Sequence, residues 1–387
     1  MSTTTTIERS VYSSSSLSGS LVPTAPIGYP LDAAPQNPII ETKTSFYQVI
    51  RHCNKFQHNV PLYEFWVAGN NRPVGHMLPE FVESMAWSPT GFIVDKNRRT
   101  VFLKPNMRKN ESLLEACQRE LITLCRLNVA TVDGVGAWVG AWDRNQDAEH
   151  HPVQDVTAHL SGLKVPSPLR GVLGIITTGA HMNVYTLERG AMRIWVAKRA
   201  QNITYAGKLD QLVAGGMDPQ DDNDALETLR REAMEEAGLA IDTQTRQVMQ
   251  RDTCQVLGTV HDGPDISFFD KKGEDAGSER GQLEPGIRYT FDLCVDADVV
   301  LRPYEPDCIA GFFLWSVDRV KASLKCGEWK PNCGLVMLDF LLRHNQIAPS
   351  EDDQFDQLTT GLHRQLPFDS SRQFAAGLPS RCAVSLL

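Results

Sequence analysis

Residues 230–239 read RREAMEEAGL, and this stretch constrains the fold more than any other part of the chain. On a helix, residues three and four apart are neighbours, so Glu232, Glu235 and Glu236 project from one side. An apolar stripe lies beside this acidic side and not opposite to it (Leu226, Leu229, Ala233 and Ala237). The sequence therefore predicts a helix that carries its carboxylates at the rim of a hydrophobic core.

Three neighbouring carboxylates repel one another at neutral pH unless a cation joins them, and oxygen donors suit Mg2+ or Mn2+. Acidic runs are also common on solvated helices, where they indicate only i,i+4 pairing, here between Arg231 and Glu235. The preceding segment favours a metal site, because it predicts an apolar strand, a Gly215-Gly216 turn and a helix capped by Asp224. A carbonyl of this turn could reach the same cation as the helix. The predicted metal ligands are Gly216, Glu232, Glu235 and Glu236.

This segment resembles the Nudix box, G-x5-E-x7-R-E-U-x-E-E-x-G-U, in which U is aliphatic. The second half is in register (Arg231, Glu232, Ala233, Glu235, Glu236, Gly238 and Leu239). The first half departs from the pattern, with Met217 at the glycine position and Asn223 at the glutamate position. The resemblance implies an α/β/α Nudix sandwich, a Mg2+ or Mn2+ cofactor, catalytic Glu232, Glu235 and Glu236, and an Arg231 that orients them.

A narrower resemblance, over about residues 170–346, is to the thiamin-pyrophosphokinase-related Nudix proteins of fungi and plants. Its landmarks are GAHMNVY (179–185), RIWVAKRA (193–200), GKLDQLVAGG (207–216), YTFDL (289–293) and EWKPNCGLVMLDFLLRHN (328–345). The resemblance implies hydrolysis of thiamin diphosphate, or a damaged form of it, to the monophosphate. Polar and cationic side chains within these segments are candidates for holding the phosphates (Lys208, Arg199, His181 and Asn183), with Lys208 preferred.

A late strand of the family has the pattern D-G-E-V-E, and this chain matches the pattern only in part. Ile309 and Gly311 stand at its two glutamate positions, and Glu305 and Asp307 are the nearby acids. Three functions therefore remain open. The protein is a hydrolase of thiamin-type diphosphates, a hydrolase of another diphosphate such as a prenyl diphosphate, or a catalytically weakened binding module.

The chain of 387 residues predicts several regions. We expect a disordered Ser/Thr-rich leader (1–40), an N-terminal α+β domain (41–165), the Nudix domain (166–346) and a C-terminal tail (347–387). The N-terminal domain should contain helices near 44–56 and from Asn110 to 127, a strand at 62–68 and a hairpin at 92–103. Strands are expected at 171–177, 193–199, 210–215, 254–260, 286–295 and 310–317, and a helix at 333–344. Trp66, Trp87, Trp138 and Trp142 fit core packing or stacking on a flat substrate.

The composition indicates which classes of partner and which cellular compartment to expect. A net charge of -9 disfavours nucleic acid, which is bound by basic surfaces. No apolar run approaches the roughly 20 residues that cross a bilayer. The nine cysteines show no CxxC spacing, which is typical of reduced thiols in a cytoplasmic protein. The expected partner is a small-molecule diphosphate, and the oligomeric state is left open.

Overall fold

The computed structural model describes residues 45–57, 59–136, 139 and 149–366. The predicted leader, Trp138 and Trp142 lie outside these residues. All of the described residues belong to one compact unit, residues 41–387. None of the described helices is long and apolar enough to span a membrane.

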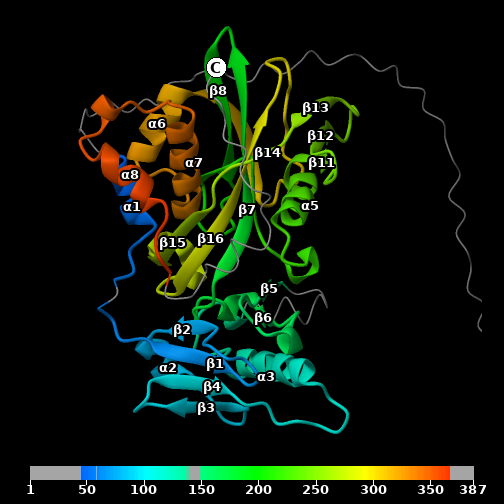
Figure 1. Cartoon of the computed structure of the whole chain (residues 1–387), viewed down its shortest axis with the longest axis vertical. Coiled ribbons are helices and arrows are strands. Elements are labelled where there is room, and N and C mark those ends of the chain that lie inside the picture. The colour runs from blue at the N-terminus through cyan, green and yellow to red at the C-terminus, as the bar shows by residue number, and fades with distance from the viewer. Residues whose placement is uncertain (1–44, 58, 137–138, 140–148, 367–387) are drawn as a thin grey trace, which may run out of the picture. The chain divides into compact units, whose positions relative to one another are not determined.

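The first part of this unit is built on a four-stranded sheet in the order β2-β1-β4-β3 (β1 Tyr63–Val67, β2 Gly75–Met77, β3 Phe92–Asp95 and β4 Thr100–Leu103). The antiparallel β3–β4 pair confirms the predicted hairpin, and β1 pairs in parallel with β4. Two helices, α2 (Pro79–Ser84) and α3 (Leu113–Leu127), accompany the sheet (Figure 1). Their apolar side chains and those of the sheet share one core.

The predicted start of α3 at Asn110 is wrong. Ser112 caps the helix by accepting a hydrogen bond from the Glu115 backbone N–H, while the Glu115 carboxylate accepts one from the Ser112 N–H. This reciprocal capping box satisfies two free donors of the first turn. Asn110 has a φ of 62°, which lies outside the helical region.

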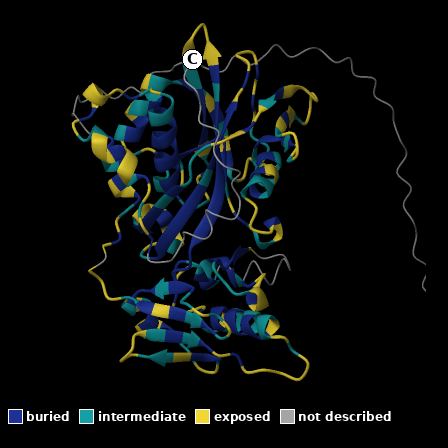
Figure 2. Cartoon of the chain, in the orientation of Figure 1, coloured by how far each residue is buried: buried dark blue, intermediate teal, exposed yellow. Residues whose placement is uncertain are grey.

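The central sheet has eight strands, with the order β14-β16-β7-β8-β17 and with β10, β15 and β9 paired to β7, β16 and β8. Its strands are β7 (Thr177–Glu188), β8 (Ala191–Arg199), β9 (Leu209–Asp210), β10 (Val213–Gly216), β14 (His261–Asp262), β15 (Ile266–Lys271), β16 (Leu283–Cys294) and β17 (Ile309–Ser316). Figure 2 shows that β7 and β16 are buried along most of their length. The predicted strands at 193–199, 286–295 and 310–317 correspond to β8, β16 and β17, the one at 210–215 is divided into β9 and β10, and β7 was not predicted.

Helices cover both faces of this sheet, which confirms the predicted α/β/α sandwich (Figure 1). On one face, α5 (Ala225–Ala237) packs its apolar side against β7 and β10. On the other, α6 (Val317–Lys325) and α7 (Pro331–Arg343) share a core with Ile194 and Trp315 of the sheet. The helix α5 therefore lies on the opposite face of the sheet from α6 and α7.

Two predicted strands have different places. Residues 171–174 form turns, with a φ of 59° at Gly174, and Ile175 makes only an isolated antiparallel bridge to Gly75. The expected strand at 254–260 is β13 (Val256–Thr259), which belongs to a separate sheet with β11 (Leu239–Ile241) and β12 (Gln247–Gln250). The central sheet consequently begins at Thr177.

The first described helix, α1 (Tyr47–His52), packs on the central-sheet side of the molecule. Phe46, Val49 and Ile50 share a core with α7 and with α8 (Phe355–Gly361). The sequence predicts α1 within the N-terminal domain and a tail over residues 347–387. The structure instead joins α1 to α8, because each buries its apolar side in one core with α7.

Candidate metal and catalytic site

The helix α5 begins and ends where its sequence predicts. The Asp224 carboxylate accepts hydrogen bonds from the N–H groups of Leu226, at 2.8 Å, and Glu227, at 3.4 Å. The helix ends at Gly238, whose φ of 61° is the left-handed conformation that glycine adopts readily. Leu229 and Ala233 are fully buried. Both ends are thus fixed, and the acidic side is held along the edge of the core.

Two of the three predicted carboxylates turn toward the protein. Glu236 is partly buried, and its Oε2 accepts a hydrogen bond from the Ala214 N–H at 2.9 Å. Burial, followed by the neighbouring Glu232, raises the pKa of Glu236 well above its usual value. Burial also raises the pKa of Glu232 to about 7, although Arg231 opposes this shift. The side chain of Glu235 is 53% exposed and lies at the solvent edge.

Arg231 connects the helix to the loop before it. Its guanidinium donates to both Asp221 oxygens at 3.0 Å, to Glu232 at 2.8 Å and to the Gly216 carbonyl oxygen at 2.9 Å. Its distance to the Glu235 carboxylate is 3.3 Å. This is the contact pattern of a residue that orients carboxylates.

Asp221 is a site residue that the sequence analysis missed. It is buried, and it also accepts hydrogen bonds from the Asp218 N–H and the Thr228 hydroxyl. The family pattern placed an acidic residue at position 223. Asn223 instead is exposed and accepts a hydrogen bond from Gln154 at 3.0 Å. The acidic loop residues offered the only sequence signal for Asp221, without distinguishing among them.

The two glycines before α5 lie in a strand and not in the predicted turn. Gly215 and Gly216 end β10 and pair with Ala180 and Gly179 of β7. A Cβ on Gly215 would lie 1.8 Å from Cδ of Glu232, whereas a Cβ on Gly216 would meet nothing within 4 Å. Gly215 therefore allows the carboxylate of Glu232 to lie directly against the strand, and Gly216 offers the carbonyl.

The four predicted phosphate-binding residues lie at different distances from the box. Arg199 lines a cavity of about 20 Å³ together with Asp210, Gln211 and Glu236, so it lies beside the box carboxylates. His181 is buried, with Nδ1 2.9 Å from the Gln211 side-chain oxygen. Burial is the main cause that lowers the His181 pKa to about 3, which keeps the ring neutral.

Lys208 and Asn183 have structural partners elsewhere. The Lys208 ammonium donates to the Gly327 carbonyl at 3.0 Å and pairs with Asp275 at 3.1 Å. Asn183 is fully buried and donates to Asp292 at 3.0 Å. Among the residues that the structure describes, neither side chain forms a hydrogen bond or salt bridge with α5, so the structure does not bring them to the box. Similarly, the Trp66 indole donates to Glu64, and the Trp87 indole donates to the Val82 carbonyl.

The late-strand positions face opposite sides of the sheet. Ile309 lines the same small cavity as Glu236 and shares the core of the α5 face. A Cβ on Gly311 would instead contact the ring of Phe313 at 3.4 Å. Because of a register shift between Ile309 and Gly311, the two positions face opposite sides of the sheet. Ile309 is therefore the position from which an acid would face the box.

A second group of possible metal ligands lies nearby. Among the residues that the structure describes, His181, Asp210 and Cys333 are the group whose donor atoms all lie within 4.8 Å of one another. Asp210 already pairs with Arg199 at 3.0 Å and with Lys330 at 3.9 Å. Since two cations balance this carboxylate, we assign the group a structural role. The box glutamates have no such excess of positive charge.

Comparison with known proteins agrees with the geometry of α5 and its sheet. Residues 178–319 match the model of the NUDIX domain. These residues form a NUDIX domain. It is 34% identical to the Saccharomyces cerevisiae protein YJR142W over 53% of this chain and 57% of that protein. It is 25% identical to the Arabidopsis thaliana protein "Nudix hydrolase 20, chloroplastic" over 81% of this chain and 76% of the relative.

A third Nudix relative, the Arabidopsis thaliana protein "Nudix hydrolase 24, chloroplastic", is 28% identical over 58% of this chain and 53% of its own length. The chain thus spans little more than half the length of two of these three relatives. The Nudix match includes β7, β8, α5, β16 and β17, and the residues around Glu236 all lie within it.

Proposed function

We propose that this protein hydrolyses an organic diphosphate to a monophosphate and phosphate with the help of Mg2+ or Mn2+. The observation that carries the proposal is the pair Glu232 and Glu236, whose pKa values burial raises. Within the described residues, no basic side chain forms a salt bridge with Glu236. A partly buried acid of this kind requires a proton or a bound cation at neutral pH.

The donors at the site fit a hard divalent cation. Glu232 and Glu236 supply carboxylate oxygens, Gly216 supplies a carbonyl, and Glu235 lies at the solvent edge of the same helix turn. All of these donors are oxygens, which Mg2+ and Mn2+ prefer. When bound, such an ion neutralises phosphate oxygens and lowers the pKa of a water molecule. Glu232, Glu235, Glu236 and the Gly216 carbonyl would hold this ion.

The chain's own residues supply orientation and a proton acceptor. In the reaction, water attacks phosphorus, a new P–O bond forms and the P–O bond to the leaving phosphate breaks. One of the box carboxylates accepts the proton of the attacking water. Arg231, fixed by Asp221, holds Glu232 in one direction during this transfer.

For the substrate, we infer thiamin diphosphate or a damaged form of it. The support is the run of landmarks from residue 179 to 345 that resembles the thiamin-pyrophosphokinase-related Nudix proteins. A prenyl diphosphate is the alternative within the same reaction class. It differs in the apolar group that the protein must accommodate, so a substrate comparison distinguishes the two.

A second candidate function is a binding module that has lost much of its catalysis. Ile309 favours it, because this apolar side chain lines the cavity beside Glu236 where an acid would face the box. The Ile309→Glu variant tests this candidate. A several-fold gain in hydrolysis by a folded variant supports a weakened enzyme, whereas no gain on any diphosphate indicates that the box alone supplies the chemistry.

The main experiment measures phosphate release from thiamin diphosphate, oxidised thiamin diphosphate and geranyl diphosphate, each with Mg2+, Mn2+ or EDTA. We expect metal-dependent release that is fastest with a thiamin-type substrate. Glu227→Gln is a matched control, because Glu227 lies on the same helix but pairs with Arg230 at 2.6 Å. Release that persists undiminished in EDTA, or is absent with every substrate, would contradict the proposed hydrolase.

A further inference from the structure

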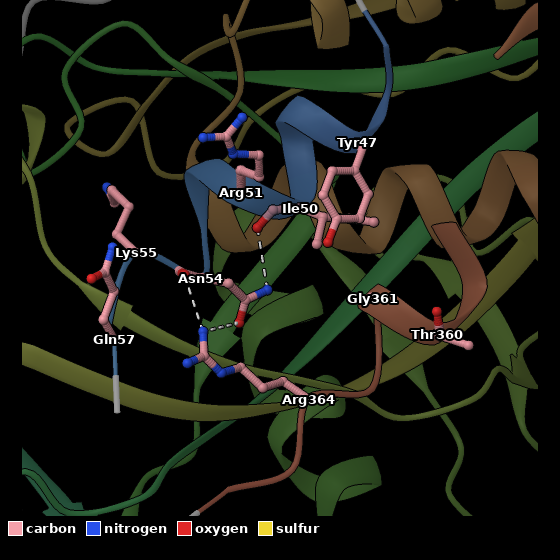
Figure 3. Close-up of a pocket in the computed structure, with 9 residues that line it drawn as sticks. All are labelled: Tyr47, Ile50, Arg51, Asn54, Lys55, Gln57, Thr360, Gly361 and Arg364. Carbon is pink, nitrogen blue, oxygen red and sulfur yellow. Dashed lines mark hydrogen bonds between the residues drawn. The ribbon is translucent and has the colours of Figure 1, made fainter. Parts of the chain in front are cut away.

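A second polar cavity, of about 440 Å³, lies between α1 and α8 (Figure 3). We propose that it binds a small organic phosphate monoester at a site separate from the Nudix box. Its volume falls within the roughly 300–1,000 Å³ of small-molecule pockets. Residues from both ends of the described chain line it, among them Tyr47, Ile50, Arg51, Lys55, Thr360 and Arg364.

The cavity lies on the other side of the central sheet from the box helix. The helices α1 and α8 share their core with α7, whereas α5 shares its core with the opposite face of the sheet. Figure 1 shows α1 and α8 beside α7, with the sheet between them and α5. A ligand here would therefore occupy a site distinct from that of Glu232 and Glu236.

Within the described part of the chain, the lining carries three cations and no carboxylate. Arg364 is a structural part of the wall, since its guanidinium donates to the carbonyl oxygens of Asn54, at 3.0 Å, and Phe56, at 2.6 Å. Lys55 pairs with the buried Asp270 at 3.4 Å. Arg51 is exposed, and among the described residues it has no salt bridge. The cavity thus has more positive charge than its neighbours balance.

The charges of these cations also act on the neighbouring His52. The pKa of His52 is lowered by burial and then by the charges of Lys55, Lys208 and Arg51. This local excess contrasts with the net charge of -9 of the whole chain. An anion in the cavity would relieve the repulsion between Arg51 and Lys55, and an arginine–lysine pair is well suited to phosphate.

The arrangement of the lining favours a monoester with a small organic group. Figure 3 shows Arg51 and Lys55 on one side of the view, and Tyr47 and Thr360 on the other. A phosphate monoester is close to a dianion at pH 7 and can meet both cations. The Tyr47 ring and Ile50 provide an apolar wall for the remaining atoms. A simple carboxylate would supply only half of the charge.

The test uses phenyl phosphate as the probe and benzoate as its single-charge counterpart, both titrated calorimetrically into the full chain. EDTA is present throughout, so that no metal can hold an anion at the box. Phenyl phosphate should bind, and Arg51→Gln should weaken its affinity by about tenfold or more. Arg98→Gln is the matched control, because the Arg98 side chain is 84% exposed and lies on the distant β3–β4 hairpin.

A second variant, Thr360→Tyr, fills the cavity without removing a charge. Thr360 is exposed, so the larger side chain should fold normally and block the probe. Melting temperatures without ligand verify the fold of each variant. Equal affinity in Arg51→Gln, Thr360→Tyr and the wild type would overturn the site. Benzoate binding as tightly as phenyl phosphate would overturn the assignment to a phosphate ester.

Discussion

Two groups of buried carboxylates in this protein differ in how the protein balances their negative charge. At one, Glu284 is buried beside Lys272 and Arg288, with its carboxylate 3.3 Å and 2.6 Å from their nitrogens. Burial opposes ionisation there, but Lys272, Arg288 and Arg170 hold the pKa of Glu284 far below its usual value. At the other, burial raises the pKa of Glu232 and Glu236, and Arg231 is shared with Asp221.

The difference separates a structural ion cluster from a site that needs an external ion. Around Glu284, cations of the chain satisfy the carboxylate and fix β16 to its surroundings. Around Glu236, the chain supplies one backbone N–H and no salt bridge within the described residues. Such uncompensated acids are typical of functional sites.

The largest expected effect is on catalysis by the box. Glu236→Gln keeps the shape of the side chain but removes the charge that would hold a cation. We expect hydrolysis to fall on the order of a hundredfold to a thousandfold, and the metal-free variant to be at least as stable as wild type. Initial rates and thermal melts measure both properties. A variant with wild-type rates would remove Glu236 from the site.

The opposite result is expected at the compensated cluster. Glu284→Gln leaves Lys272 and Arg288 buried with less negative charge, so it should lower the free energy of unfolding by about 3–5 kcal/mol. Denaturant unfolding measures the loss. A stability unchanged from that of the wild type would show that the two groups of carboxylates do not differ as described.

The glycines of β10 provide a matched pair of substitutions. Gly215→Ala places a methyl group in the position of the Glu232 side chain, so activity should fall by about tenfold or more. Gly216→Ala enters open space and should leave activity close to wild type. Activity assays on the two folded variants test this contrast. Equal losses would indicate that the approach of Glu232 to the strand does not matter.

The pH dependence of stability should differ in sign between the groups. The native state holds a proton on Glu232 more tightly than the unfolded state, since its pKa rises from 4.5 to about 7. Metal-free protein should therefore lose on the order of 3 kcal/mol as the pH rises through this range, and Glu232→Gln should lose less. The lowered pKa of Glu284 instead stabilises the protein above pH 4.5 and loses this contribution at lower pH. Denaturant unfolding in EDTA, at pH 2.5 to 8, tests both slopes.

Much of the box could be predicted from the sequence because it is local. Helical spacing alone places Glu232, Glu235 and Glu236 on one side, and Asp224 and Gly238 end the helix through their own backbone preferences. The sandwich followed from the alternation of strands and helices. These features depend on residues that are close together in the chain.

The partner of Arg231 could not be predicted in this way. Counting along the family pattern led to position 223, but Asp222 and Asn223 adopt φ values of 50° and 60°. This left-handed turn leaves Asn223 exposed, while Asp221 is buried against Arg231. The loop after Gly216 is one residue longer than in the family pattern. The conformation of this loop decides which acid pairs with Arg231.

Contacts between distant segments were also beyond the sequence. The partners of Lys208 and Asn183 lie more than a hundred residues away, at Gly327 and Asp292. The basic cavity joins Arg364 to Asn54, which are 310 residues apart. Periodicity shows that α1 buries one side, but it does not show which helix covers that side.

The most direct test of the central claim is calorimetric titration of Mn2+ into wild type, Glu236→Gln and Glu227→Gln at pH 7.5. The claim is that the carboxylates of α5, among them Glu236 without a salt bridge in the described residues, hold a divalent cation. We expect Glu227→Gln to bind Mn2+ as wild type does, because Glu227 pairs with Arg230 away from the site. Glu236→Gln should bind at least about tenfold more weakly. Equal binding by all three proteins would contradict the account.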